Sequence, residues 1–339
     1  MSTYEESAKI QELVNGANKI LILQADNPDG DSLGSALALE QIFHELGKEP
    51  LLVCGVNMPS YLYYFPGWDR VDKDVPNDFD LSIIVDCGNL GLFGSLERAN
   101  QLGPLHSRPC IVLDHHDVDQ SIPFATVTCN NKAVATGEVI YEIAKDQNWP
   151  INNLAADRLA SSILSDSLGL MSEGTTVRSI HIIAELVEKG VNLAELEDAR
   201  RTLMRKSPEL INYKGELLQR IEYFDDNKIA IIVIPWEEIE QYSHAFNPSM
   251  LVLDDMRLTE GTDIAIAFKL YKTGRITAKI RCNYGISIAS ELAEHFGGGG
   301  HAYASGFRIE ANAHKPFSDV KSECIEEASK LLANMKSDI

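Results

Sequence analysis

Acidic side chains and two adjacent histidines follow short apolar runs at several points of this sequence. In chain order these residues are Asp29, Asp31, Asp86, Asp114, His115, His116 and Asp166. Carboxylates that lie a few ångströms apart repel one another unless cations neutralise them. Several carboxylates with one or two imidazoles form a donor set suited to Mn²⁺ or Mg²⁺. The residue types therefore favour a site for divalent cations, and without a cysteine cluster nearby a structural zinc site is not expected.

Each of these residues also has a simpler interpretation. Asp31 has the residue type that caps a helix starting at Ser32, and Asp29 with Gly30 is typical of a turn. Asp86 taken alone could be a solvated side chain, and a histidine pair can lie on a surface turn. Because acids follow four strand or helix ends in chain order, we favour the cation site over these separate interpretations.

Strands that alternate with helices are expected to position these residues. The predicted strands are residues 19–24, 51–54, 81–85 and 110–113. The first predicted helix starts at residue 32 and is ended by Gly47, and the other predicted helices cover 133–145, 154–164 and 177–188. The alternation predicts an α/β fold with a parallel sheet covered by helices on both faces. Such sheets bind ligands outside the carboxyl ends of their strands, which is where these acids gather.

A second, smaller α/β domain is expected after a helical linker. We expect the first domain at residues 1–190, the linker at 191–224 and the second domain at 225–339. Within the linker, two helices at 193–204 and 209–224 are separated by residues 205–208. In the second domain the predicted strands are 229–234, 264–271, 275–281 and 305–309, and the predicted helices are 237–241, 249–255, 286–296 and 317–335.

A run of glycines at residues 297–300 joins a predicted helix to a predicted strand. Glycine runs are often flexible linkers, but the position of this one inside a domain argues against that. Because glycine has no Cβ, its backbone N–H groups can approach an anion closely, and arginine can bind phosphate through two hydrogen bonds. The predicted anion-binding residues are Gly298, Gly299, Gly300, His301, Arg281 and Ser305.

Two other clusters have residue types that could contact nucleotides. The aromatic cluster is Tyr61, Tyr63, Tyr64, Phe65 and Trp68, and the basic cluster is Arg200, Arg201, Arg205 and Lys206. Aromatic rings can stack on bases, and basic side chains can attract polyanions. For the first cluster we favour packing of a loop against the first domain, and for the second a solvated helix face.

The composition excludes several classes of protein. The 339 residues include 30 Lys and Arg against 50 Asp and Glu, which gives a net charge of −20. This charge would repel long nucleic acids, although a small phosphorylated ligand is compatible with bound cations. No apolar run approaches the ~20 residues of a membrane helix, so no membrane partner is expected. The start lacks a signal peptide and the six cysteines are scattered, which predicts a cytoplasmic protein with reduced thiols.

The motifs resemble those of a known family. The matching segments are residues 27–35 (NPDGDSLGS), 85–87 (VDC), 114–116 (DHH), 165–167 (SDS), 297–301 (GGGGH) and 304–307 (ASGF). In this order and spacing they resemble the DHH phosphoesterase superfamily, in the branch that carries a DHHA1 domain. The size and two-domain layout are similar to those of nanoRNase/pAp phosphatases, which act on short oligoribonucleotides, rather than to the longer RecJ-type exonucleases.

This resemblance implies a role for each residue of the predicted site. It implies a hydrolase that uses two divalent cations, Mn²⁺ or Mg²⁺, to activate a water molecule. Asp29 and Asp86 would hold the first cation. The second cation would be held by Asp31, Asp86, His115 and Asp166. His116 would lie beside the substrate phosphate, Asp114 would orient its neighbours, and the glycine loop would belong to the substrate-binding face.

One position departs from the family pattern. The family has a histidine three residues before Pro28, and this chain has Ala25 there. Because alanine has no lone pair, we expect the first cation to be weakly held or absent. Asp26 lies beside it in sequence, but its side chain is expected to point elsewhere. Two explanations stay open: a natural variant with reduced activity, or an engineered substitution that removed the ligand.

The expected function is hydrolysis of phosphodiester or phosphomonoester bonds in short oligoribonucleotides, in pAp, or in both. The alternatives are a phosphodiesterase for cyclic di-AMP or its linear product pApA, and a catalytically weakened nucleotide-binding protein. A type II inorganic pyrophosphatase is disfavoured because that branch carries a different second domain. The expected partners are short RNA or a small nucleotide and not long nucleic acid, with a homodimer left open.

Overall fold

The chain folds into two compact units. The computed structural model describes residues 3–116, 122–313 and 315–335. The first unit comprises Met1–Arg205 and the second Lys206–Ile339. Each unit contains a β-sheet with helices packed on it, so the predicted α/β class is confirmed.

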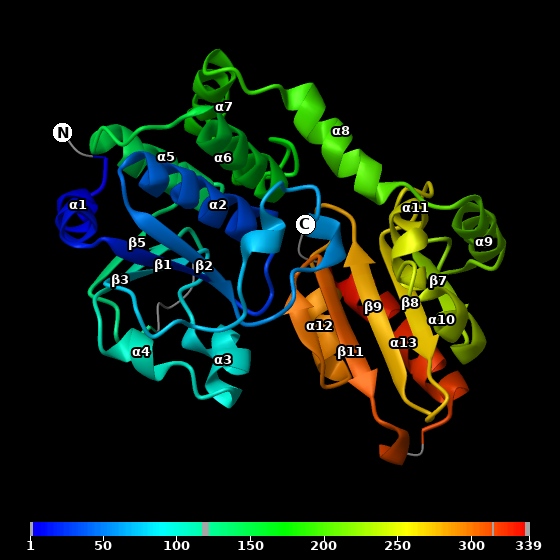
Figure 1. Ribbon diagram of the computed structural model, residues 1–339. Coiled ribbons are helices and arrows are strands. Elements are labelled where there is room, and N and C mark those ends of the chain that lie inside the picture. The colour runs from blue at the N-terminus through cyan, green and yellow to red at the C-terminus, as the bar shows by residue number, and fades with distance from the viewer. Residues whose placement is uncertain (1–2, 117–121, 314, 336–339) are drawn as a thin grey trace. The chain divides into compact units, whose positions relative to one another are not determined.

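The first unit is built on a five-stranded parallel sheet (Figure 1). Its strands are β1 (Lys19–Gln24), β2 (Glu49–Cys54), β3 (Leu81–Val85), β4 (Cys110–Asp114) and β5 (Val127–Asn130). They lie in the order β2-β1-β3-β4-β5, and every neighbouring pair is parallel. Strand β5 was not predicted from the sequence, because it is short and has one buried side chain, Cys129, so its apolar signal is weak.

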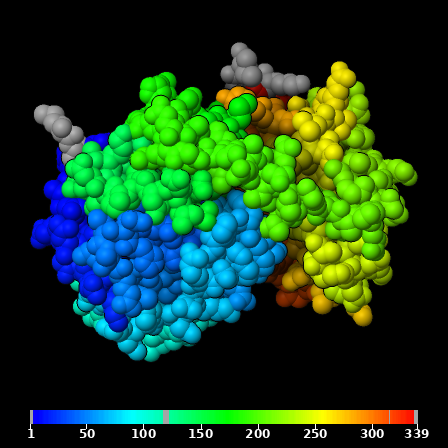
Figure 2. Space-filling view, turned by 45° about the horizontal axis from the view of Figure 1, so that its top comes forward, coloured from blue at the N-terminus to red at the C-terminus, as the bar shows by residue number. Residues whose placement is uncertain are grey.

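Helices pack on both faces of this sheet. The helices of this unit are α1 (Ser7–Gly16), α2 (Gly30–Glu45), α3 (Gly94–Arg98), α4 (Gly103–His106), α5 (Thr136–Asp146), α6 (Asn153–Asp166), α7 (Val177–Glu188) and α8 (Leu193–Met204), of which α8 has no buried residue and does not cover the sheet. Ile20 and Ile22 of β1 belong to the core that includes α2, α5 and α6, whereas Leu21 and Leu23 face α3 and α4. Because side chains alternate along a strand, β1 is buried on both faces and lacks polar alternation. In the space-filling view the green surface of α5 to α7 adjoins the blue surface that includes α2 (Figure 2).

The second unit contains a six-stranded mixed sheet. Its strands are β6 (Glu222–Phe224), β7 (Ile229–Ile234), β8 (Ile264–Leu270), β9 (Ile276–Cys282), β10 (Gly299–His301) and β11 (Ala304–Ile309). The order is β10-β11-β9-β8-β7-β6, and β7 with β8 is the parallel pair. Its helices are α9 (Pro208–Gln219), α10 (Trp236–Tyr242), α11 (Leu253–Arg257), α12 (Ala289–His295) and α13 (Phe317–Met335). In the described parts of both units, 3₁₀ turns lie at Ser60–Leu62, Trp68–Arg70, Leu90–Phe93, Pro248–Leu251 and Ala311–Ala313.

Helices cover the two faces of the second sheet unequally. One face packs against α12 and α13. On the other face α9, α10 and α11 share a core with alternate residues of β7 and β8, which include Ala265 and Ala267. On β9, Thr277, Lys279 and Arg281 alternate with buried residues and are half-buried. The β9 to β10 half of this face is therefore polar and accessible within the second unit.

Several predicted element boundaries were wrong. The helix predicted at 209–224 ends at Gln219, because the residues that follow form the edge strand β6. The helix predicted at 249–255 is a 3₁₀ turn followed by α11, and the helix predicted at 286–296 is shortened to α12. The predicted helix over 193–204 is confirmed as α8, which belongs to the first unit.

None of the helices in the described ranges is long and apolar enough to cross a membrane. The six cysteines are all buried and unpaired with one another. Burial raises the pKa of each of their thiols, which keeps them protonated and weakly reactive at neutral pH.

Candidate metal centre

Asp29 begins α2 and caps it. Its carboxylate accepts hydrogen bonds from the backbone N–H groups of Asp31 and Ser32, each at 3.0 Å. The hydroxyl of Ser32 accepts in return from the backbone N–H of Asp29, which completes a capping box. The interpretation of Asp31 as the cap of this helix was therefore wrong, because Asp29 takes that position and the helix starts at Gly30.

Asp31 instead faces the start of a different helix. Its carboxylate accepts hydrogen bonds from the backbone N–H groups of Thr136 at 2.7 Å and Gly137 at 3.3 Å, the first two residues of α5. It also accepts from the hydroxyls of Ser162, at 2.5 Å, and Ser35, at 3.2 Å. The positive end of α5 and these donors keep a buried carboxylate in one orientation. Asp31 is therefore fixed before any ligand binds.

Close packing of α6 on α2 places the two acids of these helices together. A Cβ at Gly30 would lie 2.1 Å from Oγ of Ser165, and a Cβ at Gly34 would lie 2.9 Å from Cβ of Ser162. Both glycines are therefore needed for the approach of α6. Asp166, the last residue of α6, is brought to the first turn of α2 by this packing.

Asp86 follows the last residue of β3 in an unusual backbone conformation. Its φ is 59°, in the left-handed region that a side chain other than glycine rarely adopts. Its backbone N–H donates to the carbonyl of Leu113, and its carboxylate accepts from the hydroxyl of Thr136 at 3.0 Å. Burial, followed by the charges of Asp31 and Asp29, raises the pKa of Asp86 well above its ordinary range. Strained backbone and crowded charge together mark a functional position.

His115 lies at the centre of the acids. Its Nδ1 forms a hydrogen bond with the carbonyl oxygen of Ala133 at 3.2 Å, so this nitrogen carries the proton. Its Nε2 is then free to act as a ligand, and lies 3.5 Å from a carboxylate oxygen of each of Asp31, Asp86 and Asp166. Burial, then the charge of Asp31, raises the pKa of Asp166 to about 6.

His116 and Asp114 form a pair beside this centre. Nδ1 of His116 donates to a carboxylate oxygen of Asp114 at 2.8 Å, and the same oxygen accepts from the backbone N–H of His115 at 2.9 Å. The hydrogen bond to Asp114 raises the pKa of His116. Asp114 is fully buried whereas His116 is half exposed, so Asp114 orients the histidine and leaves its Nε2 for a ligand.

The structure thus gathers most of the predicted residues into two overlapping groups. Within the described residues, the potential ligand atoms of Asp31, His115 and Asp166 lie within 4.8 Å of one another, as do those of Asp86, His115 and His116. Asp29 joins neither group. Oxygen ligands with one free imidazole nitrogen match the donors that Mn²⁺ or Mg²⁺ accepts. The residues present therefore fit a divalent cation at His115 with Asp31, Asp86 and Asp166.

The position that departs from the family pattern is apolar and closed. Ala25 is 5% exposed and belongs to the core that also contains Cys87 and Phe93. Asp26 does not replace the missing ligand, because its carboxylate accepts from the backbone N–H of Ser95 at 2.7 Å and from the hydroxyl of the same residue. The expectation that Asp26 points elsewhere is therefore confirmed.

Residues that orient the centre were not predicted from the sequence. Thr136 donates from both its backbone and its hydroxyl, to Asp31 and Asp86, and Ser162 donates to Asp31. The carbonyl of Ala133 fixes the tautomer of His115. A small polar residue opening a helix, as in ATGEV, is a weak signal because it also serves as an ordinary helix start.

Four of the predicted anion-binding residues, Gly298, Gly299, Arg281 and Ser305, line one depression of the second unit with a volume of about 810 Å³, whereas Gly300 and His301 do not line it. Gly306 pairs with Lys279, and Ala304 with Arg281, so the two basic side chains stand beside residues with little or no side chain. A Cβ at Gly306 would lie 2.6 Å from the carbonyl oxygen of Ala278. Backbone and positive charge are thus both accessible to an anion.

The glycine run forms a tight hairpin into β11 rather than a linker. A Cβ at Gly298 would lie 2.3 Å from the carbonyl oxygen of Gly306, and Gly300 has φ 143°. Gly299 pairs with Gly306, and His301 is exposed at the turn. The hydroxyl of Ser305 donates to the carbonyl of His301 at 2.7 Å, so this buried side chain supports the hairpin.

The fold and the site agree with a family assignment. Residues 19–163 match the family model described as "DHH family, N-terminal domain". This part of the chain therefore belongs to the DHH family, as its motifs indicated.

Two curated relatives extend the similarity over most of the chain. One, "Bifunctional oligoribonuclease and PAP phosphatase NrnA" of Thermus thermophilus, is 25% identical over 300 residues, which are 88% of this chain and 86% of the relative. The other, "A-adding tRNA nucleotidyltransferase" of Aquifex aeolicus, is 27% identical over 326 residues. That match covers 94% of this chain and 35% of the relative, so the chain spans about a third of that protein's length.

Solved structures share the fold. An exopolyphosphatase-related protein from Bacteroides fragilis has a TM-score of 0.78 at 18% identity, with 98% of this chain and 96% of that chain covered. RecJ from Thermus thermophilus, solved in complex with Mn²⁺, has a TM-score of 0.53 at 15% identity, with 96% of this chain and 54% of that chain covered. At these identities the likeness shows the fold alone.

Proposed function

We propose that this chain hydrolyses phosphodiester or phosphomonoester bonds in short oligoribonucleotides, in pAp, or in both, with Mn²⁺ bound. The observation that carries the proposal is the convergence of three carboxylates on one imidazole nitrogen. Nε2 of His115 lies 3.5 Å from Asp31, Asp86 and Asp166, and no lysine or arginine is paired with these three acids in the described part of the unit. The relative from Thermus thermophilus, described as an oligoribonuclease and PAP phosphatase, supports the choice of substrate class.

In this proposal Asp31, Asp86, His115 and Asp166 hold a divalent cation. Bound there, it would neutralise charge on the reacting phosphate and make a water molecule easier to deprotonate. Mn²⁺ fits a site of mixed carboxylate and imidazole donors, and a related fold was solved with Mn²⁺. Asp29 and Asp86 would hold a second cation, and Ala25 offers no ligand for it, so we expect this position to be the weaker one.

The chain's own groups have separate tasks around the phosphate. Thr136 and Ser162 keep Asp31 and Asp86 oriented through hydrogen bonds that exist without substrate. His116, with Nδ1 bonded to Asp114, presents Nε2 to a phosphate oxygen. Its raised pKa favours the charged form, which attracts a phosphate anion.

The second unit supplies an anion-binding surface. Arg281, Lys279 and the backbone around Gly298 and Gly299 would bind a phosphate group. Burial, followed by the neighbouring charge of Arg257, lowers the pKa of Arg281, so the guanidinium gains from an anion that balances its charge.

Binding of a phosphate by this surface is predicted to weaken above about pH 8. Burial, then the charge of Lys279, lowers the pKa of Lys269 to about 8, and Lys269 lies on the same face as Lys279 and Arg281. As the pH rises through this value, Lys269 loses its charge and with it an attraction for the anion. Titration of the full chain with a nucleoside monophosphate in EDTA, between about pH 7 and about pH 9.5, measures this effect.

The matched variant for this prediction is Lys269→Arg, because arginine stays charged over the whole range. Its affinity should change little where the wild-type affinity falls. An affinity for the monophosphate that is flat with pH in the wild-type protein, or one that falls equally in both proteins, would show that Lys269 does not contribute.

A second candidate function is nucleotide binding without turnover. Ala25 favours it, because the family pattern has a metal-ligating histidine there and this chain has a closed apolar position. In this case the chain would bind the same class of ligand, small nucleotides, without hydrolysing it.

A panel of phosphate compounds tests the proposal. The wild-type protein and Ala25→His are incubated with Mn²⁺ and, separately, with pAp, linear dinucleotides, longer oligonucleotides, cyclic di-AMP and pyrophosphate. We expect linear dinucleotides and pAp to be hydrolysed fastest. Preference for cyclic di-AMP or pyrophosphate would contradict the substrate class, and tight binding of dinucleotides by both proteins with no turnover would establish the second candidate.

A further inference from the structure

A pocket of about 530 Å³ lies in the first unit beside the metal centre, between the end of α6, the helix α8 and the loop that contains Tyr64. Its volume is in the range of about 300–1,000 Å³ typical of small-molecule sites. Its walls are mostly apolar, and include Leu164, Leu168, Leu193 and Leu196. From the sequence we expected Tyr64 to pack a loop against the first domain and Arg200 to lie on a solvated helix face. Neither role explains why the two side chains line one pocket.

The end of α6 exposes a leucine in a strained backbone. Leu168 is 74% exposed and has φ 53°, in the left-handed region that is unfavourable for a bulky residue. The backbone around it is fixed by hydrogen bonds from Gly169 N–H to Leu164 O and from Leu170 N–H to Ser167 Oγ, each 2.8 Å. Leu168 follows Asp166 by two residues, and its backbone conformation is unfavourable while its apolar side chain is exposed. We expect such a side chain where an apolar group of a ligand covers it.

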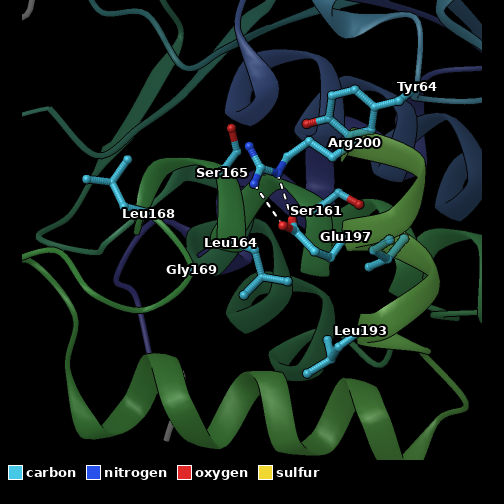
Figure 3. Close-up of a pocket in the computed structure, with 10 residues that line it drawn as sticks. Tyr64, Ser161, Leu164, Ser165, Leu168, Gly169, Leu193, Glu197 and Arg200 are labelled. Carbon is cyan, nitrogen blue, oxygen red and sulfur yellow. Dashed lines mark hydrogen bonds and ion pairs between the residues drawn. The ribbon is translucent and has the colours of Figure 1, made fainter. Parts of the chain in front are cut away.

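The polar groups of the pocket carry no net charge. Arg200 donates from Nε and Nη2 to the two carboxylate oxygens of Glu197, at 2.8 Å and 2.9 Å. Figure 3 shows Arg200 reaching towards Ser165, with Glu197 beside it and the ring of Tyr64 above. Because the guanidinium of Arg200 is already paired with Glu197, the pocket offers a planar guanidinium held in place, an aromatic ring and hydroxyls.

The pocket adjoins the residues that would hold the reacting phosphate. Ser165 lines the pocket and precedes Asp166, and its Oγ packs against Gly30, which precedes Asp31. The hydroxyl of Tyr64 lies 3.5 Å from the position a Cβ would take on Gly30. A group attached to a phosphate at the metal centre therefore lies within reach of this pocket.

We propose that this pocket binds the nucleobase of a nucleotide whose phosphate lies at the metal centre. The inference rests on the proposed function and adds to it the part of the enzyme that recognises the base. A base is flat, uncharged and edged with hydrogen-bonding groups, which matches a pocket with leucine walls, Tyr64, Arg200 and the hydroxyls of Ser161 and Ser165. The stacking groups tolerate any base, so we expect weak preference among bases.

The experiment measures binding of a dinucleotide that contains the fluorescent base 2-aminopurine, made non-hydrolysable by a phosphorothioate link. The full-length protein is titrated with two probes, one with 2-aminopurine at the 5′ position and one with it at the 3′ position. We expect one of the two probes to be quenched on binding, because stacking quenches this base. Arg200→Ala and Leu168→Asp should each weaken that binding about tenfold and reduce the quenching.

Arg201→Ala is the matched control. Arg201 also pairs with Glu197, but it is largely exposed and does not line the pocket. It should bind both probes as the wild type does. An abasic dinucleotide should bind the wild type, Arg200→Ala and Leu168→Asp with equal affinity, because it leaves the pocket empty.

The outcomes separate the pocket from the proposed function. If the wild type binds and hydrolyses dinucleotides but both pocket variants bind the probes normally, the base lies elsewhere and the pocket proposal is wrong. If the wild type binds neither the probes nor the abasic dinucleotide, the proposed function itself fails. Equal weakening in Arg201→Ala would show that α8 acts through its fold or charge rather than through contact with a base.

Discussion

Replacing Asp86 by asparagine is expected to abolish hydrolysis while stabilising the metal-free protein. Asparagine keeps the size of the side chain and adopts a left-handed backbone readily, so the φ of 59° is preserved. The change removes the negative charge that the cation needs at this position, and we expect turnover to fall by at least about a thousandfold, in the range typical of lost electrostatic stabilisation. Initial rates with a dinucleotide and Mn²⁺ measure the loss.

The expected gain in thermal stability of Asp86→Asn follows from the pKa of the Asp86 carboxyl. Because burial and neighbouring acids raise the pKa of Asp86 in the folded state, its ionisation opposes folding. This penalty is absent at low pH, where the carboxyl is protonated in both states, and is complete above the folded pKa. In EDTA at neutral pH, Asp86→Asn should therefore unfold at a higher temperature than the wild type.

Asp26→Asn is the control for this pair of measurements. Asp26 directly precedes the motif at residues 27–35, but it bonds to Ser95 and not to the centre. It should keep its activity and gain no stability in EDTA. If Asp86→Asn retains wild-type turnover, or if it loses activity together with thermal stability in EDTA, the role given to Asp86 as a metal ligand is wrong.

Ala25→His is expected to raise turnover with Mn²⁺ by about a hundredfold or more. The change supplies an imidazole at the position where the family pattern has one, and so completes the weaker of the two proposed cation sites, whose remaining ligands are Asp29 and Asp86. Two cations stabilise both the attacking and the leaving oxygen, whereas one cation leaves part of that charge unbalanced. Dinucleotide hydrolysis by both proteins, measured up to saturating Mn²⁺, tests this.

The control is Ala25→Leu, which adds bulk without a lone pair. Ala25 lies in the core with Cys87 and Phe93, so any larger side chain must displace neighbours. Thermal unfolding of both variants shows how much of any change arises from packing. Equal rates for the wild type and Ala25→His at saturating Mn²⁺, with both folded, would mean that Ala25 is not the position that limits activity.

Local sequence patterns were sufficient to identify the acidic residues that follow the ends of strands. The apolar runs that became β1 and β3 are buried on both faces, so they stand out without any knowledge of the fold, and the acids that follow them were predicted to gather. The simpler interpretation of Asp31, as a helix cap, named the wrong residue, because the residue types of Asp29 and Asp31 both fit that position. In the structure Asp31 accepts a hydrogen bond from the first residue of α5, about a hundred residues along the chain, and a contact between such distant segments has no local sequence signal.

What could not be predicted depends on contacts between distant segments. Tyr64 and Arg200 belong to clusters with ordinary explanations, and their common pocket exists because α8 packs beside the end of α6. The same holds for Gly30 and Gly34, whose importance lies in the approach of α6 and not in the backbone of α2 itself. A sequence read one segment at a time has no signal for either relationship.

Convergence of the acids to hold divalent cations is the property on which the proposed chemistry depends. Titration of the metal-free protein with Mn²⁺ in a calorimeter tests it most directly. We expect one tight site in the wild type, a second site in Ala25→His, and no tight site in Asp86→Asn. Tight binding that persists in Asp86→Asn, or no tight Mn²⁺ or Mg²⁺ binding in the folded wild type, would contradict it.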